Sequence, residues 1–232
     1  MGEIVKPKWP NLLVVVRHGQ SEQNAAIDLL EKDLKETLKR FSKIRDMDIA
    51  LTSRGTQQAL ETGKYLAQYN FDICFSSPYK RAMQTAQAIV SKFDYEIRIF
   101  QDNRLREKEF GRLHGLTTAD IQKIYPREYD DRKRDGKYWY RLLGGENYPD
   151  VEMRVHSFLD KLVRDYSEKK VLVVTHHVPC VSFRTLFEHL DEKAVLALGD
   201  VPNCGISEYV LDTSKSPEGR MKLKEFGKVV YK

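Results

Sequence analysis

Two arginines and two histidines stand close behind apolar runs of this sequence. Arg17 and His18 directly follow five consecutive apolar residues, and His176 closely follows a second, Val-rich run. Arg81 comes shortly after a third, mostly apolar segment, at 71–75. The planar fork of an arginine binds oxyanions through paired hydrogen bonds, so two guanidinium groups and two imidazoles around one point would suit a dianion. Phosphoryl is the natural candidate, provided that the fold brings the four side chains together.

Four apolar segments predict the strands that must carry these residues. The first is fully apolar and the third is Val-rich, which is typical of strands buried on both faces, whereas the fourth alternates more, which favours a place nearer the sheet edge. Apolar residues at helical spacing predict helices between them, with Thr52 or Ser53 available to cap the first. The predicted strands are 12–16, 71–75, 171–174 and 206–211, and the predicted helices are 55–69, 81–93 and 151–166.

Strands and helices alternate along the chain, which predicts the α/β fold class. The expected architecture has three layers, α/β/α, with a mostly parallel central sheet. In open parallel sheets ligands bind beyond the carboxyl ends of the strands. Because Arg17, His18, Arg81 and His176 all lie at such ends, the pattern predicts one shared pocket.

Two further regions lack a clear strand or helix pattern. Residues 125–148 fit neither period and mix basic with aromatic side chains. They are interpreted as part of an insertion, at about 116–148, over the active site. From Lys215 to the end, six basic residues stand against two glutamates, and a solvated tail is the simplest interpretation of that charge.

Composition restricts the possible function classes. The 232 residues, 41% hydrophobic and 31% charged, suit one globular domain spanning 1–232. The formal net charge of +5 suits anionic ligands, while acidic residues within the basic cluster at 127–141 argue against nucleic acid as a partner. Cys74, Cys180 and Cys204 are too widely spaced to indicate a disulfide framework or a metal site. Without a signal-type or membrane-spanning segment, we expect a cytoplasmic protein with no membrane partner.

Several short motifs follow one another along the chain. The longer ones are RHGQSEQN at 17–24, SSPYKRAMQTA at 76–86, LREKEFGRLHG at 105–115 and VVTHH at 173–177. The shorter ones are LTSRGTQQA at 51–59, GGEN at 144–147 and PNC at 202–204. In order and spacing they resemble the histidine phosphatase superfamily, also called phosphoglycerate mutase-like, from about residue 12 to 212. The basic and aromatic insertion resembles a less-characterised phosphatase-like subgroup.

This resemblance implies a mechanism for the residues at the strand ends. Neutral His18 would attack phosphorus in line and form a phosphohistidine, which replaces one hard step by two easier ones. Glu107, selected over Glu109 by its spacing to Gly111, would protonate the leaving oxygen and then activate water. No metal ion and no cofactor are implied.

The resemblance also implies which side chains hold the phosphoryl group. Arginines and a histidine would hold its non-bridging oxygens, with a neutral amide as a further donor. The implied catalytic residues are His18, Glu107, Arg17, Arg81 and His176, and the implied substrate-binding residues are Arg17, Asn24, Arg81, His176 and His177. The other histidines are interpreted as surface or packing residues, and they are His114, His156 and His189.

Two enzyme classes share this chemistry. A phosphatase loses the phosphoryl group to water, whereas a cofactor-dependent phosphoglycerate mutase returns it to a bound substrate. Thr118 stands where the mutases' substrate-binding lysine would fall, although Arg132, Lys133 and Arg134 could supply their second basic element. We therefore expect a metal-independent phosphomonoester hydrolase acting on a small organic phosphate. A non-catalytic phospho-ligand binding module is less favoured because it has no use for Glu107, and the substrate and oligomeric state stay open.

Overall fold

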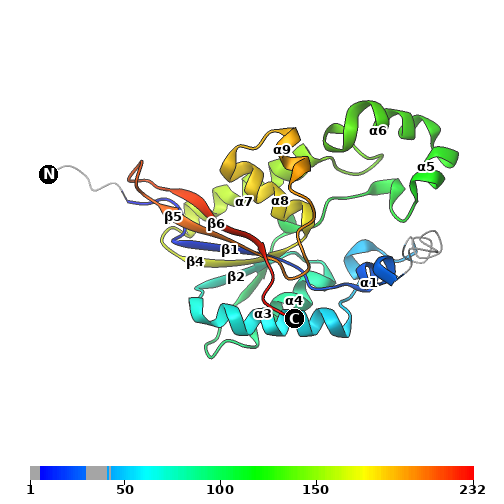
Figure 1. Cartoon of the computed structure of the whole chain (residues 1–232). Helices are drawn as coiled ribbons and strands as arrows, with labels where there is room; N and C mark the ends of the chain where they lie inside the picture. Colours follow the sequence, from blue (N-terminus) through cyan, green and yellow to red (C-terminus); the bar gives the residue numbers. More distant parts are fainter. Residues whose placement is uncertain (1–5, 30–40, 42) are drawn as a thin grey trace.

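A six-stranded sheet forms the centre of the computed structural model, which describes residues 6–29, 41 and 43–232 (Figure 1). The strands are β1 (Leu12–Arg17), β2 (Ile73–Ser76), β3 (Ile99–Gln101), β4 (Lys170–Thr175), β5 (Ile206–Asp212) and β6 (Arg220–Lys228). Their order in the sheet is β3-β2-β4-β1-β5-β6. The pairs β1–β4, β2–β4 and β2–β3 are parallel, whereas β5 is antiparallel to both β1 and β6. The prediction of a mostly parallel sheet is confirmed.

Helices cover both faces of this sheet (Figure 1). They are α1 (Glu22–Leu29), α3 (Ser53–Leu66), α4 (Lys80–Val90), α5 (Thr118–Ile124), α6 (Pro126–Trp139), α7 (Tyr148–Asp165), α8 (His177–Glu188) and α9 (Glu192–Ala197). Successive side chains of a strand point to opposite faces. Leu13 and Val15 accordingly pack in the core with α7 and α8, while Val14 and Val16 pack with α3 and α4. The predicted α/β/α layering is confirmed.

All four predicted strands and all three predicted helices form, with bounds shifted by a few residues. Thr52, one of the two predicted caps, caps α3, because its hydroxyl oxygen accepts a hydrogen bond of 2.9 Å from the Gly55 N–H. Asn147 and Asp150 form a capping box at the start of α7. Polar residues placed just before apolar stripes thus fix where these helices begin.

The C-terminal region differs from its predicted form. Instead of a solvated tail, Arg220–Lys228 is an edge strand that pairs antiparallel with β5. Met221 is buried in the core and Leu223 packs against it, while Lys222 and Lys224 are exposed. This alternation of apolar and basic residues was the overlooked signal, and lysines on an open edge discourage pairing with another sheet.

The stretch at 125–148 also differs, since most of it is helical. The α6 helix begins with Pro126 and follows α5 closely. Its apolar periodicity is weak because most of the helix is exposed; Tyr138 is buried, whereas Arg134 is exposed and pairs with Asp131 three residues before it. Helices α5 and α6 extend beyond the end of the sheet (Figure 1). The assignment of 1–232 to one domain stays a prediction.

The three cysteines are buried and free. Burial raises the pKa of each thiol, which disfavours the reactive thiolate. Within residues 6–29, 41 and 43–232, no helix is both long and apolar enough to cross a membrane.

Candidate active site

The carboxyl ends of the central strands lie level with one another. In the sheet register Arg17, the last residue of β1, is opposite Thr175, the last residue of β4. The next residue on each strand is a histidine, and the ring centroids of His18 and His176 are 5.0 Å apart. The structure therefore brings together two histidines that are far apart in the sequence, as predicted.

A tight turn holds His18 at this edge. The His18 N–H donates to the Thr175 carbonyl at 2.8 Å, one residue beyond the end of β1. The turn then passes so close to α3 that a Cβ on Gly19 would lie 2.4 Å from the Gly55 carbonyl oxygen. Glycine is therefore required directly after His18, whose own side chain is almost fully buried.

The hydrogen bonds of the His18 ring define its protonation. Nδ1 is 2.7 Å from the Gly19 carbonyl oxygen, which can only accept, so Nδ1 carries the proton. Nε2 is left with a lone pair, toward which Arg81 Nε donates at 3.3 Å. Burial, followed by the charges of Arg81 and Arg17, holds the pKa of His18 well below its usual range. At neutral pH the ring is an uncharged imidazole with Nε2 free to act as a nucleophile.

Arg81 uses its two guanidinium edges differently. Its outer edge is filled by Asp46, whose carboxylate oxygens lie 3.0 Å from Nη1 and 3.1 Å from Nη2. Its Nε faces His18. Asp46 offsets the charge of a guanidinium that is itself almost fully buried, and it orients Nε toward the histidine. Asp46 could not be identified from the sequence, because no motif or periodic pattern surrounds it.

Arg17 and His176 each keep a polar atom without a partner. The Arg17 side chain donates from Nη1 to the Val201 carbonyl, yet its buried Nε has no partner in the described part of the chain. His176 has no exposed surface; its Nε2 lies 2.8 Å from Ser77 Oγ and its Nδ1 is unpartnered among the described residues. Burial, then the charge of Arg81, lowers the pKa of His176 well below its usual range. Unsatisfied buried polar atoms of this kind are costly unless a ligand meets them.

Glu107 lies at the N-terminus of α8. Its carboxylate accepts main-chain N–H groups of Lys108 at 2.9 Å, His177 at 3.0 Å and Val178 at 3.2 Å. The neighbouring Glu109 instead accepts the Tyr79 hydroxyl at 2.6 Å and does not line the cavity beside His18. The geometry thus places Glu107, and not Glu109, where the spacing to Gly111 predicted an acid.

Two further residues position the Glu107 loop. Arg154, on α7, donates to the Glu107 carbonyl at 3.1 Å and to the Arg104 carbonyl at 2.6 Å. Glu146 binds Arg154 Nε at 2.9 Å and accepts the Glu109 N–H at 3.0 Å. Glu146 belongs to the GGEN motif, so that motif was the signal for this supporting pair.

A cavity of about 280 Å³ opens over these groups. Its lining includes the polar residues Arg17, His18, Asn24, Asp46, Arg81 and Glu107. Asn24 Oδ1 accepts hydrogen bonds from Ser21 and Asn203, which leaves the amide nitrogen as the predicted neutral donor. In the described part of the chain, no group of three or more His, Cys, Asp or Glu side chains is placed to hold a metal ion.

Three histidines near the site lie in different places. His176 lies beneath His18 and does not itself line the cavity. His177, predicted to bind substrate, lines an adjacent cavity. His114, interpreted as a surface or packing residue, lines the catalytic cavity, and its buried Nε2 has no partner among the described residues.

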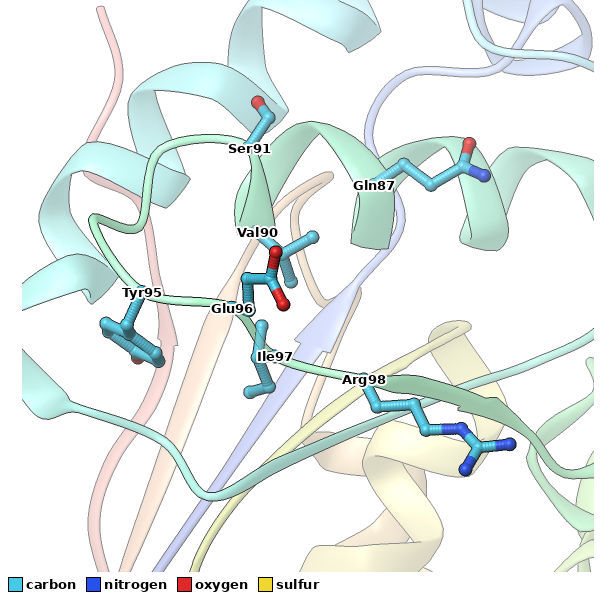
Figure 2. A pocket seen from close by; sticks show the side chains of 7 residues that line it. All are labelled: Gln87, Val90, Ser91, Tyr95, Glu96, Ile97 and Arg98. Atoms are coloured by element: carbon cyan, nitrogen blue, oxygen red, sulfur yellow. The ribbon is translucent and has the colours of Figure 1, made fainter.

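A larger hollow, of about 650 Å³, lies elsewhere, between the end of α4 and β3 (Figure 2). Its polar side chains do not converge on one point (Figure 2). Tyr95 accepts the Phe71 N–H at 2.8 Å, and the Arg98 guanidinium lies 4.4 Å from the centre of the Phe100 ring. We assign no chemistry to this hollow.

Comparison with known proteins agrees with this geometry. A family model described as "Histidine phosphatase superfamily (branch 1)" matches residues 13–221. The chain is 31% identical over 183 residues to the 2,3-bisphosphoglycerate-dependent phosphoglycerate mutase of Cytophaga hutchinsonii, with 78% of each protein covered. It is 28% identical over 167 residues to phosphoserine phosphatase 1 of Hydrogenobacter thermophilus, covering 72% of this chain and 71% of that protein.

Solved structures share the fold. The mycobacterial glucosyl-3-phosphoglycerate phosphatase, determined with inorganic phosphate, superposes with a TM-score of 0.71 at 23% identity. The match covers 95% of this chain and 98% of that one. At this identity the likeness establishes the architecture alone.

Proposed function

The chain belongs to the histidine phosphatase superfamily, and on that premise we propose that it is a metal-independent phosphomonoester hydrolase acting on a small organic phosphate. One observation carries the proposal. The His18 ring has its proton on Nδ1, bound to Gly19, and presents an unprotonated Nε2 beside Arg81. A nucleophile is effective only in its unprotonated form, and this site holds it so.

The first step transfers the phosphoryl group to His18. The Nε2 lone pair forms a bond to phosphorus while the bond between phosphorus and the ester oxygen breaks. The leaving oxygen keeps that electron pair and takes a proton from Glu107. The products of this step are an alcohol and a phosphohistidine.

The second step returns the enzyme to its starting state. Glu107, now a carboxylate, takes a proton from water as the water oxygen attacks phosphorus. The bond between phosphorus and Nε2 breaks, and its electron pair returns to His18. Inorganic phosphate leaves, so that Glu107 serves first as acid and then as base.

Charge on the non-bridging oxygens is stabilised by donors that are already in place. Arg81 Nε points at the reacting nitrogen, and Arg17 lines the cavity with an unpartnered Nε. His176 lies beneath His18, and its Nδ1 is also unpartnered among the described residues. Such preorganised donors need no rearrangement during the reaction, and in phosphoryl transfer they lower the barrier more than any other single effect.

The mutase alternative rests on relatives named as phosphoglycerate mutases, one of them 31% identical to this chain. Thr118, which stands at the position of the mutases' lysine, is the first residue of α5 and lines the adjacent cavity. A hydroxyl group cannot form the ion pair that a lysine would form with a substrate carboxylate. This residue favours hydrolysis over return of the phosphoryl group.

A panel of phosphate esters, assayed with EDTA present, tests the proposal. It includes 3-phosphoglycerate with and without 2,3-bisphosphoglycerate. We expect release of inorganic phosphate from at least one ester. Interconversion of phosphoglycerates without release would replace the hydrolase by a mutase, and binding without turnover would leave only a binding role.

A further inference from the structure

Tyr79 stands in the turn between β2 and α4, directly before the first residue of α4. Its main-chain carbonyl accepts the N–H groups of Ala82 at 2.9 Å and Met83 at 3.0 Å, so the start of the helix holds its backbone. The side chain is buried, with only 5% of the residue exposed. A tyrosine packed in this way has little freedom to move, and its side-chain contacts are fixed with it.

The Tyr79 ring contacts two residues of the candidate site. Its centre lies 5.1 Å from the centre of the His176 ring, and the two rings meet edge to face. The Arg81 guanidinium carbon lies 5.1 Å from the same centre, in a cation–π contact. The hydroxyl oxygen of Ser77 accepts the Tyr79 N–H at 3.3 Å and lies 2.8 Å from His176 Nε2. The ring therefore packs with side chains proposed to hold the phosphoryl group.

The Tyr79 hydroxyl binds the loop that carries Glu107. It donates to Glu109 Oε1 at 2.6 Å, two residues after Glu107. Burial, followed by the bond to Glu109, raises the pKa of Tyr79, so the hydroxyl keeps the proton that it donates. Two residues before Glu107, the Leu105 carbonyl accepts the Thr175 hydroxyl at 2.6 Å. The loop is thus held on both sides of Glu107, and Tyr79 supplies the second contact.

The Glu109 carboxylate depends on Tyr79 for its hydrogen bonding. The main chain of Glu109 is bound by Glu146, which accepts its N–H at 3.0 Å and donates to its carbonyl at 2.9 Å. Its carboxylate lies 3.9 Å from Arg106 Nε, which is too long for a hydrogen bond. Glu146 therefore ties the loop to the segment before α7, whereas the bond from Tyr79 ties it to the turn before Arg81.

These two attachments matter because the acid must reach a defined atom. Proton transfer requires the Glu107 carboxylate to lie within hydrogen-bond reach of the leaving oxygen, which is bonded to the phosphoryl group that Arg81 and His176 would hold. From the contacts above, and resting on the proposed function, we propose that Tyr79 is a positioning residue. Its ring packs with Arg81 and His176 and its hydroxyl binds the acid loop, so it sets the place of Glu107 relative to the phosphoryl group.

The variant Tyr79→Phe tests this role, because it keeps the ring and removes only the hydroxyl. The kcat/KM value covers the reaction up to the phosphohistidine and so reports on protonation of the leaving oxygen. For the alkyl phosphate hydrolysed fastest in the ester panel, we expect kcat/KM to fall about tenfold, as for loss of a charge-assisted hydrogen bond. For p-nitrophenyl phosphate, whose leaving group needs no proton, it should stay within about twofold. A merely structural role would lower both values alike.

Variants of Glu109 assign the effect to the hydrogen bond. Glu109→Ala removes the acceptor and should match Tyr79→Phe in its loss and in its dependence on the ester. The double variant should lose no more than either single one, because each removes the same interaction. Glu109→Gln keeps an oxygen that can accept the hydroxyl, and its kcat/KM should recover to within about threefold of the wild type. Glu109 is half-buried, so its variants remain informative if Tyr79→Phe fails to fold.

Tyr138 supplies the matched control. It is buried as well, and its hydroxyl lies 3.1 Å and 3.0 Å from the two carboxylate oxygens of Glu152, outside the catalytic cavity. Tyr138→Phe therefore removes a bond of the same kind elsewhere in the molecule. It should leave the ratio of the two kcat/KM values unchanged.

The outcomes separate this role from the proposed function. Unchanged hydrolysis of the alkyl phosphate by Tyr79→Phe, or equal losses on both esters, would overturn the positioning role while wild-type hydrolysis upheld the hydrolase. Additive losses in the double variant would overturn it too. No phosphate release from any ester by the wild type would overturn the hydrolase, and this role with it.

Discussion

The catalytic cavity and the hollow between α4 and β3 differ in whether their polar side chains have hydrogen-bond partners. The hollow between α4 and β3 is the larger, at about 650 Å³ against 280 Å³ for the catalytic cavity. Its lining includes exposed Glu96 and Arg98, which solvent can satisfy, and its polar side chains point apart (Figure 2). None of its side chains has a buried polar atom without a partner.

The catalytic cavity is the opposite case. Five buried side-chain polar atoms of the described residues lack a partner, and three of them belong to Arg17, His114 and His176. All three residues lie at or directly beneath this cavity. Folding leaves such atoms unsatisfied at a cost, and the gathering of three of them at one cavity is what a ligand site would show. Unmet hydrogen-bonding capacity, rather than volume, identifies the site.

The largest expected effect is the loss of the nucleophile. His18→Asn should reduce phosphate release to the uncatalysed background, because no other described side chain in the cavity presents an unprotonated imidazole beside Arg81. Gln87→Ala, in the larger hollow, should leave kcat/KM within about twofold, as expected for an exposed residue without a role. Equal losses in the two variants would break the distinction between the hollows.

Glu107→Gln should come next, and its effect depends on the substrate. Alkyl phosphates, whose leaving oxygen needs a proton, should lose about 100- to 10,000-fold in kcat/KM. The loss should be much smaller for p-nitrophenyl phosphate, whose leaving group is stable without one. Comparable losses on both substrates would remove Glu107 from the acid role.

The same substitution of one arginine in each hollow compares the two hollows directly. Arg81→Gln should lower kcat about 100- to 1,000-fold, since it removes a preorganised donor to the transferring group. Arg98→Gln removes a guanidinium that lies over the Phe100 ring, and activity should be unchanged. Activity loss in Arg98→Gln as severe as in Arg81→Gln would contradict the comparison.

A smaller effect is expected at the residue that orients Arg81. Asp46→Asn weakens a paired, charge-assisted contact, and we expect kcat/KM to fall about tenfold. Asp48→Asn, on an exposed carboxylate that pairs with Arg45, is the matched control and should have no effect. An unchanged Asp46→Asn enzyme would show that Arg81 needs no such support.

The smallest expected effect is that the His18 ring does not take up a proton between pH 6.5 and 5.5. A histidine with the ordinary pKa of 6.5 would be about nine-tenths protonated at pH 5.5, but His18 should remain neutral there because burial lowers its pKa. Ring-nitrogen NMR of the wild type checks this directly. The unfolded chain takes up protons that the folded one does not, so the free energy of unfolding should also decrease as pH falls below 6.5. A His18 ring protonated near pH 6.5 would be inconsistent with the buried site.

Much of the site could be predicted from the sequence because it lies at strand ends. Apolar runs indicate buried strands, and the carboxyl ends of parallel strands lie at the same edge of a sheet. His18 and His176 could therefore be placed close together from the sequence alone. Asp46 and Arg154 could not be found in this way. Both act through tertiary contacts. No motif or strand end lies beside Asp46, and the GGEN motif marks Glu146 but not its partner Arg154.

Helices with long apolar stripes could be predicted from the sequence. Elements that are mostly exposed and carry many charges could not. The helices α3 and α7 have long apolar stripes, and both were expected. Helix α6 exposes most of its residues and carries many charges, so its helical period was hidden. In β6 the basic residues outnumber the apolar ones, so the alternation of Met221 and Leu223, which pack on the core, is hard to recognise in the sequence.

Trapping a phosphorylated histidine tests the central claim most directly. The purified chain is mixed with a substrate labelled in its phosphoryl group, quenched in base within one turnover, and digested for mass spectrometry. We predict an acid-labile phosphoryl group on His18 in the wild type, and none in His18→Asn. Label on another residue, or turnover that proceeds with no phosphoenzyme on His18, would contradict the assignment of this cavity as a histidine-dependent phosphoryl-transfer site.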